Sequence, residues 1–270
     1  MGTILRHPAV AGRFYPGDPD TLRAEVQSYT TSDQKPSSAL GCVVPHAGYI
    51  YSGHVAGAVY ARLELPRRYI LMCPNHTGMG QPLSIMSQGE WETPLGRVAI
   101  DSEVAATLKD RFPLLREDTD AHQAEHAVEV HLPFLQARLP QFSFVPIALG
   151  TGHFEALEGL GQAIAEVVAA QGERVLIIAS SDMNHYENDK ITRVKDHKAI
   201  DRILALDPRG LFDVVVNEDI SMCGFGPTVA MLTAAKLLGA TSAELIKYAT
   251  SGDVSGDRKT VVGYAGVVVR

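Results

Sequence analysis

The chain contains 270 residues, of which 46% are hydrophobic and 20% are charged. This composition excludes intrinsic disorder and collagen-like or coiled-coil rods, and a chain of this length buries a sizeable core without disulfides or a structural metal. With 24 basic against 31 acidic residues, the net charge of −7 provides no basic surface for non-specific nucleic-acid binding. The three cysteines, Cys42, Cys73 and Cys223, are too few for a disulfide scaffold and are typical of a reducing cytosol.

Targeting and membrane signals are missing from the sequence. The first eight residues lack the apolar core and the small-residue cleavage site of a signal peptide. No run reaches the roughly 18 apolar residues that a membrane helix needs. We therefore expect a cytoplasmic protein that binds neither a membrane nor nucleic acid.

Helical patterns occur in five segments. The first begins at Asp18, a favourable N-cap, with Pro19 at the first helical position and with Leu22 and Val26 four residues apart. The others cover residues 121–139, with a break or kink near Pro133, and then 155–171, 190–206 and 227–238.

Short apolar runs that end in polar loops predict buried strands at residues 42–44, 69–73, 144–149 and 175–179. Residues 83–88 and 97–100 flank a turn-like segment, 91–96, and predict a hairpin, while 245–250 and 261–269 predict two final strands. Strands interleaved with helices, without a repeat or a long linker, predict a single-domain α/β fold over residues 1–270, layered around a central mixed sheet.

Three of the predicted strands end next to side chains that can bind a metal or catalyse a reaction. These are His46, His76 and the pair Asp182 and His185. Ligands of open α/β sheets bind at the carboxyl ends of the strands, and imidazole is a common ligand of iron, copper and zinc. Because the chain has ten histidines, solvated loop histidines remain the alternative interpretation.

Two residues are candidates for the anionic ligand that would accompany two histidines. Asp182 would complete a face of two histidines and one carboxylate, which suits ferrous iron. Cys223 directly precedes a predicted helix, whose dipole favours a thiolate, so it is a candidate metal ligand or nucleophile. Its alternative role is that of a small buried hydrophobic residue.

Residues 118–131 are rich in histidine and acid. His122 and His126 are four residues apart, as are Glu125 and Glu129, so each pair is expected to share a helix face. The zinc-protease motif HExxH is excluded because Gln123 follows His122. Glu125 or His126 could orient a metal ligand or act as a general acid or base, and a solvated, charge-rich helix face is the alternative.

Several sequence blocks, taken together and in order, resemble the Memo-like protein family, known as protein B of the AmmeMemoRadiSam system. They are residues 6–16 (RHPAVAGRFYP), 45–53 (PHAGYIYSG), 74–78 (PNHTG), 125–134 (EHAVEVHLPF), 180–186 (SSDMNHY) and 223–224 (CG). This family is similar in fold to the class III non-haem-iron extradiol dioxygenases. Ala127 and Cys73 depart from the residues common in the family, and neither is a proposed ligand.

The resemblance implies a metal site with His46, His76 and Cys223 as ligands, and with His185 and Asp182 beside them as acid/base or ligand groups. A thiolate in place of the carboxylate of the dioxygenases is a softer ligand, which favours copper (Cu) or a redox-active Fe(II) site over simple ring cleavage. The system name implies a radical SAM protein and an AMMECR-type domain protein as partners, and an animal relative implies a peptide ligand.

Three functions are therefore compatible with the sequence. The first is a metal-dependent redox enzyme, similar to a dioxygenase, that uses iron or copper on an unknown substrate. The second is a metal-free nucleophilic enzyme, in which Cys223 attacks and His185 or His46 acts as the base. The third is a non-catalytic module whose dioxygenase-like cleft binds a peptide or protein.

Overall fold

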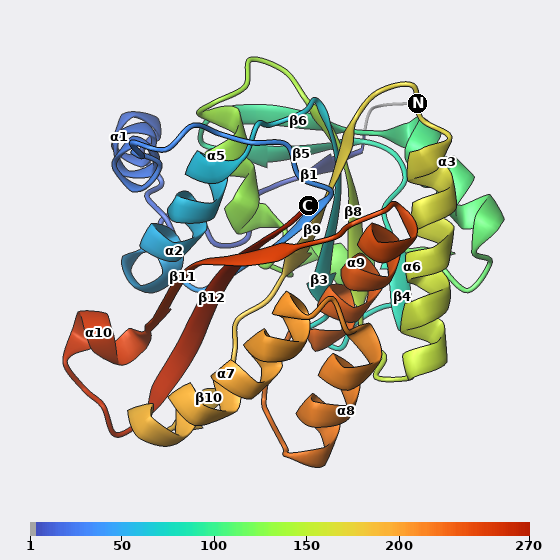
Figure 1. Ribbon diagram of the computed structural model, residues 1–270. Helices are drawn as coiled ribbons and strands as arrows, with labels where there is room; N and C mark the ends of the chain where they lie inside the picture. The colour runs from blue at the N-terminus through green and yellow to red at the C-terminus, as the bar shows by residue number, and fades with distance from the viewer. Residues whose placement is uncertain (1–3) are drawn as a thin grey trace.

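A mixed β-sheet forms the centre of the molecule in the computed structural model, which describes residues 4–270 (Figure 1). The strands follow the order β1 (Leu5–Arg6), β5 (Glu90–Thr93), β6 (Gly96–Ile100), β8 (Ser143–Leu149), β3 (Arg68–Pro74), β9 (Val175–Ser180), β2 (Gly41–Val44), β12 (Val261–Val269) and β10 (His185–Glu187). Three more strands join this path: β11 (Ala243–Thr250) pairs with β12, β4 (Leu83–Ile85) with β8, and β7 (Arg116–Glu117) with β4. The central strands β8, β3, β9 and β2 are parallel to one another.

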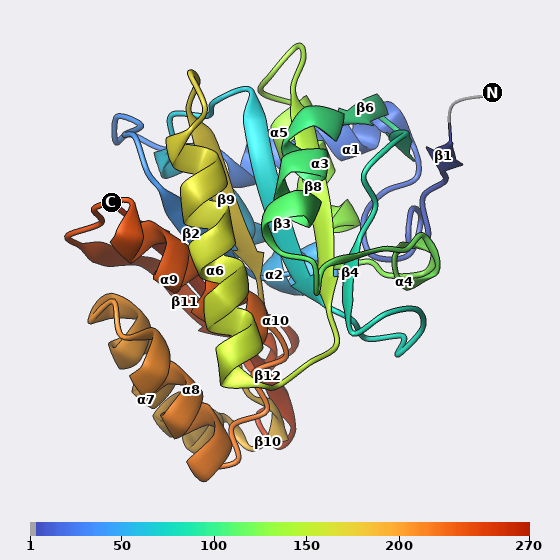
Figure 2. The same ribbon diagram turned by 90° about the vertical axis from the view of Figure 1, so that its right-hand side faces the viewer.

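Helices cover both faces of the sheet (Figures 1 and 2). One face carries α1 (Pro19–Tyr29), α2 (Tyr49–Arg62) and α5 (Leu132–Gln136). The other carries α3 (Ser102–Arg111), α6 (Phe154–Ala169), α7 (Asp189–Leu204), α8 (Pro208–Asn217) and α9 (Phe225–Leu237). The short helices α4 (Asp120–Gln123) and α10 (Ser251–Ser255) lie in connecting segments. This arrangement confirms the predicted single-domain α/β fold with a mixed sheet.

Alternate residues of the central strands enter two separate cores. On β3, Ile70 and Met72 pack with the layer that contains α6 and α9, whereas Leu71 and Cys73 pack with the layer of α1 and α2. All four side chains are fully buried, as expected for a parallel strand covered on both faces. The continuous apolar runs of the sequence therefore reflect burial on both sides of the sheet.

The predicted hairpin is wrong in one of its two strands. β6 forms, but its antiparallel partner is β5, which lies in the segment predicted to be the turn. Thr93 pairs with Gly96, so residues 94–95 make the turn, and Gly96 adopts a φ of +120° that glycine tolerates best. Trp91 on β5 is fully buried. Residues 83–85 form β4 instead and pair with β8.

The predicted helix at residues 121–139 is also wrong, because the segment forms three short pieces. These are α4, a 3₁₀ turn at Glu129–His131 and α5, in which Pro133 lies in the first turn. The backbone between them is satisfied by side chains: Arg6 donates to the carbonyl groups of His122 and Glu125, and Ala127 N–H donates to the Glu125 carboxylate. Such contacts replace helical hydrogen bonds and let the chain turn.

Four helices, α2, α3, α8 and the short α10, were not predicted. α2 is buried around much of its circumference, so it lacks the clear apolar stripe of a surface helix. α8 carries the same start signal as α1, with Asp207 as N-cap and Pro208 in the first turn. No helix in residues 4–270 is long and apolar enough to cross a membrane.

Candidate metal centre

The carboxyl ends of three adjacent parallel strands carry the residues singled out in the sequence. β9 lies between β2 and β3, with Val44 opposite Ser180 and Met72 opposite Ala179. His46, Asp182 and His76 each lie two residues beyond the end of their strand. The strand register therefore brings residues that are distant in sequence to the same edge of the sheet.

Cys223 reaches this edge from the start of α9. Gly224 is the N-cap of α9, and its N–H donates to Ser181 Oγ at 3.1 Å. A Cβ atom at Gly224 would lie only 2.7 Å from Ser181 Cα, so only glycine permits this close approach. The Cys-Gly pair therefore places the sulfur against the end of β9.

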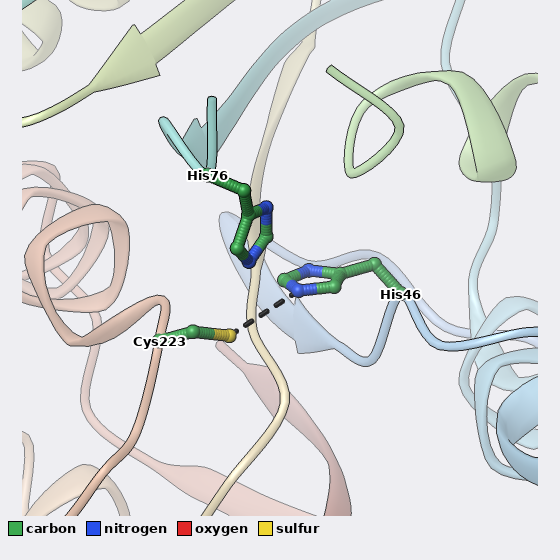
Figure 3. Close-up of side chains that lie close together, drawn as sticks. All are labelled: His46, His76 and Cys223. Carbon is green, nitrogen blue, oxygen red and sulfur yellow. Dashed lines mark hydrogen bonds between the residues drawn. The ribbon is translucent and has the colours of Figure 1, made fainter. Parts of the chain in front are cut away.

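Ligand atoms of His46, His76 and Cys223 all lie within 4.8 Å of one another (Figure 3). Cys223 Sγ is 3.2 Å from His46 Nε2, and the two imidazole rings meet edge to face at a centroid distance of 5.1 Å. Two imidazoles and a thiol form a donor set that suits iron, copper or zinc. This set matches the ligands that the family resemblance implied.

Glu125 holds His76 in place. Its Oε1 accepts from His76 Nδ1 at 2.9 Å and from Ala127 N–H at 2.9 Å, while Oε2 accepts from His76 N–H at 2.7 Å. Burial raises the pKa of Glu125, but these hydrogen bonds and the neighbouring imidazoles lower it more, so the carboxylate is charged. Burial lowers the pKa of His76, but the hydrogen bond and charge of Glu125 raise it more. Because Nδ1 of His76 donates to Glu125, a metal would bind at Nε2 in place of a proton.

The charge-rich segment around Glu125 is buried, so its interpretation as a solvated helix face is wrong. Glu125, Glu129 and His131 have no exposed surface. Because α4 ends at Gln123, the predicted shared faces do not form, and the two histidines separate. His126 stacks on His76 at a centroid distance of 4.8 Å, whereas His122 packs against Trp91 at 5.9 Å.

Asp182 shapes the turn that carries His46. Its Oδ1 accepts from His46 N–H at 2.8 Å and from Ala47 N–H at 3.3 Å. Burial raises the pKa of Asp182 to about 6, although both backbone hydrogen bonds lower it. Two groups of converging ligand atoms occur among residues 4–270, His46/His76/Cys223 and His76/Glu125/His126, and Asp182 belongs to neither. Its Oδ2 lies 3.9 Å from His46 Nε2, and its hydrogen bonds hold the turn.

His185 is partly buried and is held by Ser221. Its backbone N–H donates to Ser221 Oγ at 2.7 Å, and its Nδ1 is 2.8 Å from the Ser221 carbonyl oxygen. A carbonyl oxygen only accepts, so Nδ1 carries the proton and Nε2 is left with a lone pair. Among the described residues, His185 also belongs to neither group of converging ligand atoms.

Burial sets the protonation states of His46 and Cys223. Burial lowers the pKa of His46, and the nearby imidazoles lower it further. The dipole of α9 was expected to lower the pKa of Cys223. Burial raises this pKa instead, and the Asp182 carboxylate adds to the increase. The metal-free pair is thus a neutral imidazole and a thiol, and a bound cation would displace the thiol proton.

A cavity of about 320 Å³ adjoins the site and includes His76 and Cys223 in its wall. The rest of the wall comes from residues 74–75, 149–152 and 225–227. None of these lining residues is Asp, Glu, Lys or Arg. Beside the converging ligand atoms, the cavity therefore has His76 and Cys223 as its ionisable wall residues.

Sequence analysis missed Ser180 and His131. The Oγ atom of Ser180 lies 2.7 Å from His46 Nδ1, 2.8 Å from His131 Nε2 and 2.6 Å from the Ala127 carbonyl oxygen. The only signal in the sequence was a hydroxyl at the end of an apolar strand. Its partners come from segments that are 49 to 134 residues away.

Asp196 anchors the loop that carries Asp182 and His185. It is fully buried in α7 and accepts from Asn184 N–H at 2.8 Å and from Tyr248 O–H at 2.6 Å. Burial raises the pKa of Asp196 from 3.8 to about 7, although these hydrogen bonds and the nearby His197 and Arg193 lower it. Near neutral pH, the loop is thus held by a carboxyl group that resists ionisation.

This property predicts a pH dependence of stability. Between pH 3.8 and about 7, the folded protein keeps a proton on Asp196 that the unfolded chain loses. The stabilisation is complete below 3.8 and is lost as the pH rises through about 7. From pH 5 to pH 8, wild-type protein should lose about 1 to 3 kcal/mol more unfolding free energy than Asp196→Asn in urea titrations. Asp213→Asn, with a side chain 45% exposed, is the control that should follow wild type, and parallel curves for Asp196→Asn would contradict the assignment.

Comparison with known proteins gives consistent matches over nearly the whole chain. A family model described as Memo-like protein matches residues 6–268. A MEMO1 family protein of Methanosarcina barkeri is 46% identical over 267 residues, which cover 98% of this chain and 100% of the relative. MEMO1 family proteins of Methanothermobacter thermautotrophicus and Methanopyrus kandleri are each 42% identical, over 97% and 98% of this chain and 99% of each relative.

Proposed function

The chain belongs to the Memo-like protein family, and on that premise we propose that it is a metal-dependent redox protein that binds Fe(II) or copper. The ligands are His46 Nε2, His76 Nε2 and Cys223 Sγ. The observation that carries the proposal is the convergence of these three donors within 4.8 Å, from three separate segments of the chain. The donor set of two imidazoles and one thiol is a soft one, which favours a redox-active metal.

Surrounding residues prepare the site for such a role. When bound, the metal supplies one-electron redox chemistry and Lewis acidity. Glu125 fixes the orientation of His76, and Asp182 holds the turn of His46. His185 accepts or donates a proton at Nε2, because its Nδ1–H is committed to the Ser221 carbonyl group.

The adjoining cavity supports a small substrate. Apart from His76 and Cys223, its wall offers no ionisable side chain. The apolar part of the wall comes from Pro74, Leu149, Phe225 and Pro227, and Thr151 and Asn75 add neutral polar atoms. A substrate bound there would lie directly beside the metal ligands.

Metal analysis of anaerobically purified protein tests the proposal. Wild-type protein reconstituted with Fe(II) or Cu(I) should retain about one equivalent after desalting, whereas His46→Ala and Cys223→Ser should retain little. His153→Ala, at an exposed position, and Cys42→Ala, within β2, are matched controls that should behave as wild type. Equal metal content in all five proteins would refute the site.

A metal-free Cys–His enzyme is the second candidate function. Its support is the distance of 3.2 Å between Cys223 Sγ and His46 Nε2, which suits a nucleophile and its base. The raised pKa of Cys223 and the lowered pKa of His46 both oppose the thiolate–imidazolium pair that such an enzyme needs. Rapid alkylation of Cys223 by iodoacetamide at pH 7, unchanged by chelators, would favour this candidate over the first.

A further inference from the structure

Ser180 lies at the end of β9, fully buried, and its hydroxyl oxygen has three close neighbours. The Ala127 carbonyl oxygen is 2.6 Å away, His46 Nδ1 is 2.7 Å away and His131 Nε2 is 2.8 Å away. A serine hydroxyl has one hydrogen to donate and two lone pairs that accept. It can therefore bond to three neighbours only if it donates to one and accepts from the other two.

The distance to Ala127 shows which neighbour receives the hydrogen of Ser180. Two oxygen atoms 2.6 Å apart need a hydrogen between them, and a carbonyl oxygen has none to give. The Ser180 hydroxyl therefore donates to Ala127. Both lone pairs of Ser180 are then left to accept, so His46 and His131 must each present an N–H group.

The surroundings of His131 agree with this assignment. Its Nδ1 is buried and has no hydrogen-bond partner within residues 4–270. A lone pair is a less costly group to leave unpaired there than an N–H group, so the proton belongs on Nε2, which faces Ser180. His131 thereby donates to the Ser180 hydroxyl and helps to hold it in place.

We propose that Ser180 is a positioning residue that fixes His46 as the tautomer with the proton on Nδ1, so that the Nε2 lone pair is available between Cys223 and His76. This inference rests on the proposed function, in which Nε2 of His46 binds the metal. Histidines that bind metals commonly donate their other N–H to a fixed partner, and such partners contribute 10-fold to 100-fold to metal affinity. Glu125 is that partner for His76, and Ser180 is that partner for His46.

Cys223 favours the same tautomer in the metal-free protein, because its thiol can donate to His46 Nε2. A sound test therefore removes the thiol. In metal-free Cys223→Ala, two-bond ¹H–¹⁵N NMR spectra should still show His46 protonated on Nδ1, since Ser180 alone maintains it. In Cys223→Ala/Ser180→Ala, the His46 signals should shift towards the Nε2–H form. Ser84→Ala removes another fully buried hydroxyl, on β4, and should leave His46 unchanged.

Co(II) binding, measured by competition with a chelator, provides the second readout with Cys223 intact. Ser180→Ala should weaken Co(II) binding by about 10-fold to 100-fold, and Ser180→Thr, which keeps the hydroxyl, should recover most of the loss. Detection of His46 with its proton on Nε2 in Cys223→Ala would overturn the inference, even if the Ser180 variants fail to fold. If wild-type protein binds no Co(II), Fe(II) or copper while the tautomer shift occurs, the proposed function falls and the role of Ser180 stands.

Discussion

Replacing Arg6 by Met should lower the free energy of unfolding by about 3 to 5 kcal/mol, which is the usual effect of removing one member of a buried ion pair. Arg6 and Glu129 form a salt bridge in which neither side chain is exposed. Arg6 also donates to two backbone carbonyl groups and lies over the ring of Trp91 at 4.3 Å. The variant leaves the Glu129 carboxylate buried without its counter-charge.

Urea unfolding at pH 7 measures this effect, and two further variants sharpen it. Arg111→Ala breaks a salt bridge to Glu166 in which both side chains are 62% exposed, and it should cost less than about 1 kcal/mol. Arg6→Met/Glu129→Gln should be less destabilised than the sum of the two single variants, because no unpaired charge remains. A loss below 1 kcal/mol in Arg6→Met would contradict the assigned role of this pair.

Replacing Glu125 by Gln should weaken metal binding by about 10-fold to 100-fold, because His76 loses the carboxylate that orients it. All three hydrogen bonds to Glu125 come from N–H groups, and the amide of Gln would present a donor to one of them. The side chain is fully buried, so water cannot compensate. Competition titration with Co(II) measures the change in affinity.

The control for this prediction is a carboxylate with similar partners far from the site. Glu117 accepts from the backbone and side chain of Ser87 and from Lys109, and Glu117→Gln should bind Co(II) as wild type does. Wild-type affinity in Glu125→Gln would show that the orientation of His76 does not depend on this carboxylate.

Local sequence signals predicted those parts of the fold that local forces determine. The Asp18 side chain accepts from Thr21 N–H at 2.9 Å and caps α1 as its position indicated. The apolar runs on β2, β3, β8 and β9 became buried strands because both faces of the sheet are covered. The helix predicted at residues 121–139 does not form as one helix, because Arg6, more than a hundred residues earlier, donates hydrogen bonds to two of the segment's carbonyl groups.

The residues of the candidate site also differ in whether local sequence could predict them. His46, His76 and Asp182 could be singled out because a polar residue after a buried strand is visible within a few residues of sequence. Cys223 could be singled out from the predicted helix that follows it and from the family resemblance. Ser180 and the contact of Glu125 with His76 were not foreseeable as neighbours, because they depend on strand register and on the path of the 124–131 segment.

The three converging residues are far apart in sequence, so their site can form only late in folding. His46 and Cys223 are separated by 177 positions, and their atoms meet only after the sheet has assembled and α9 has packed on it. During synthesis, a nascent chain that has released His46 and His76 still lacks the sulfur donor. The unfolded chain has no preorganised three-donor site, so a metal at the proposed site would bind the folded chain, and unfolding would release it. On the proposed function, the ion would therefore be delivered to the folded protein and not to the emerging chain.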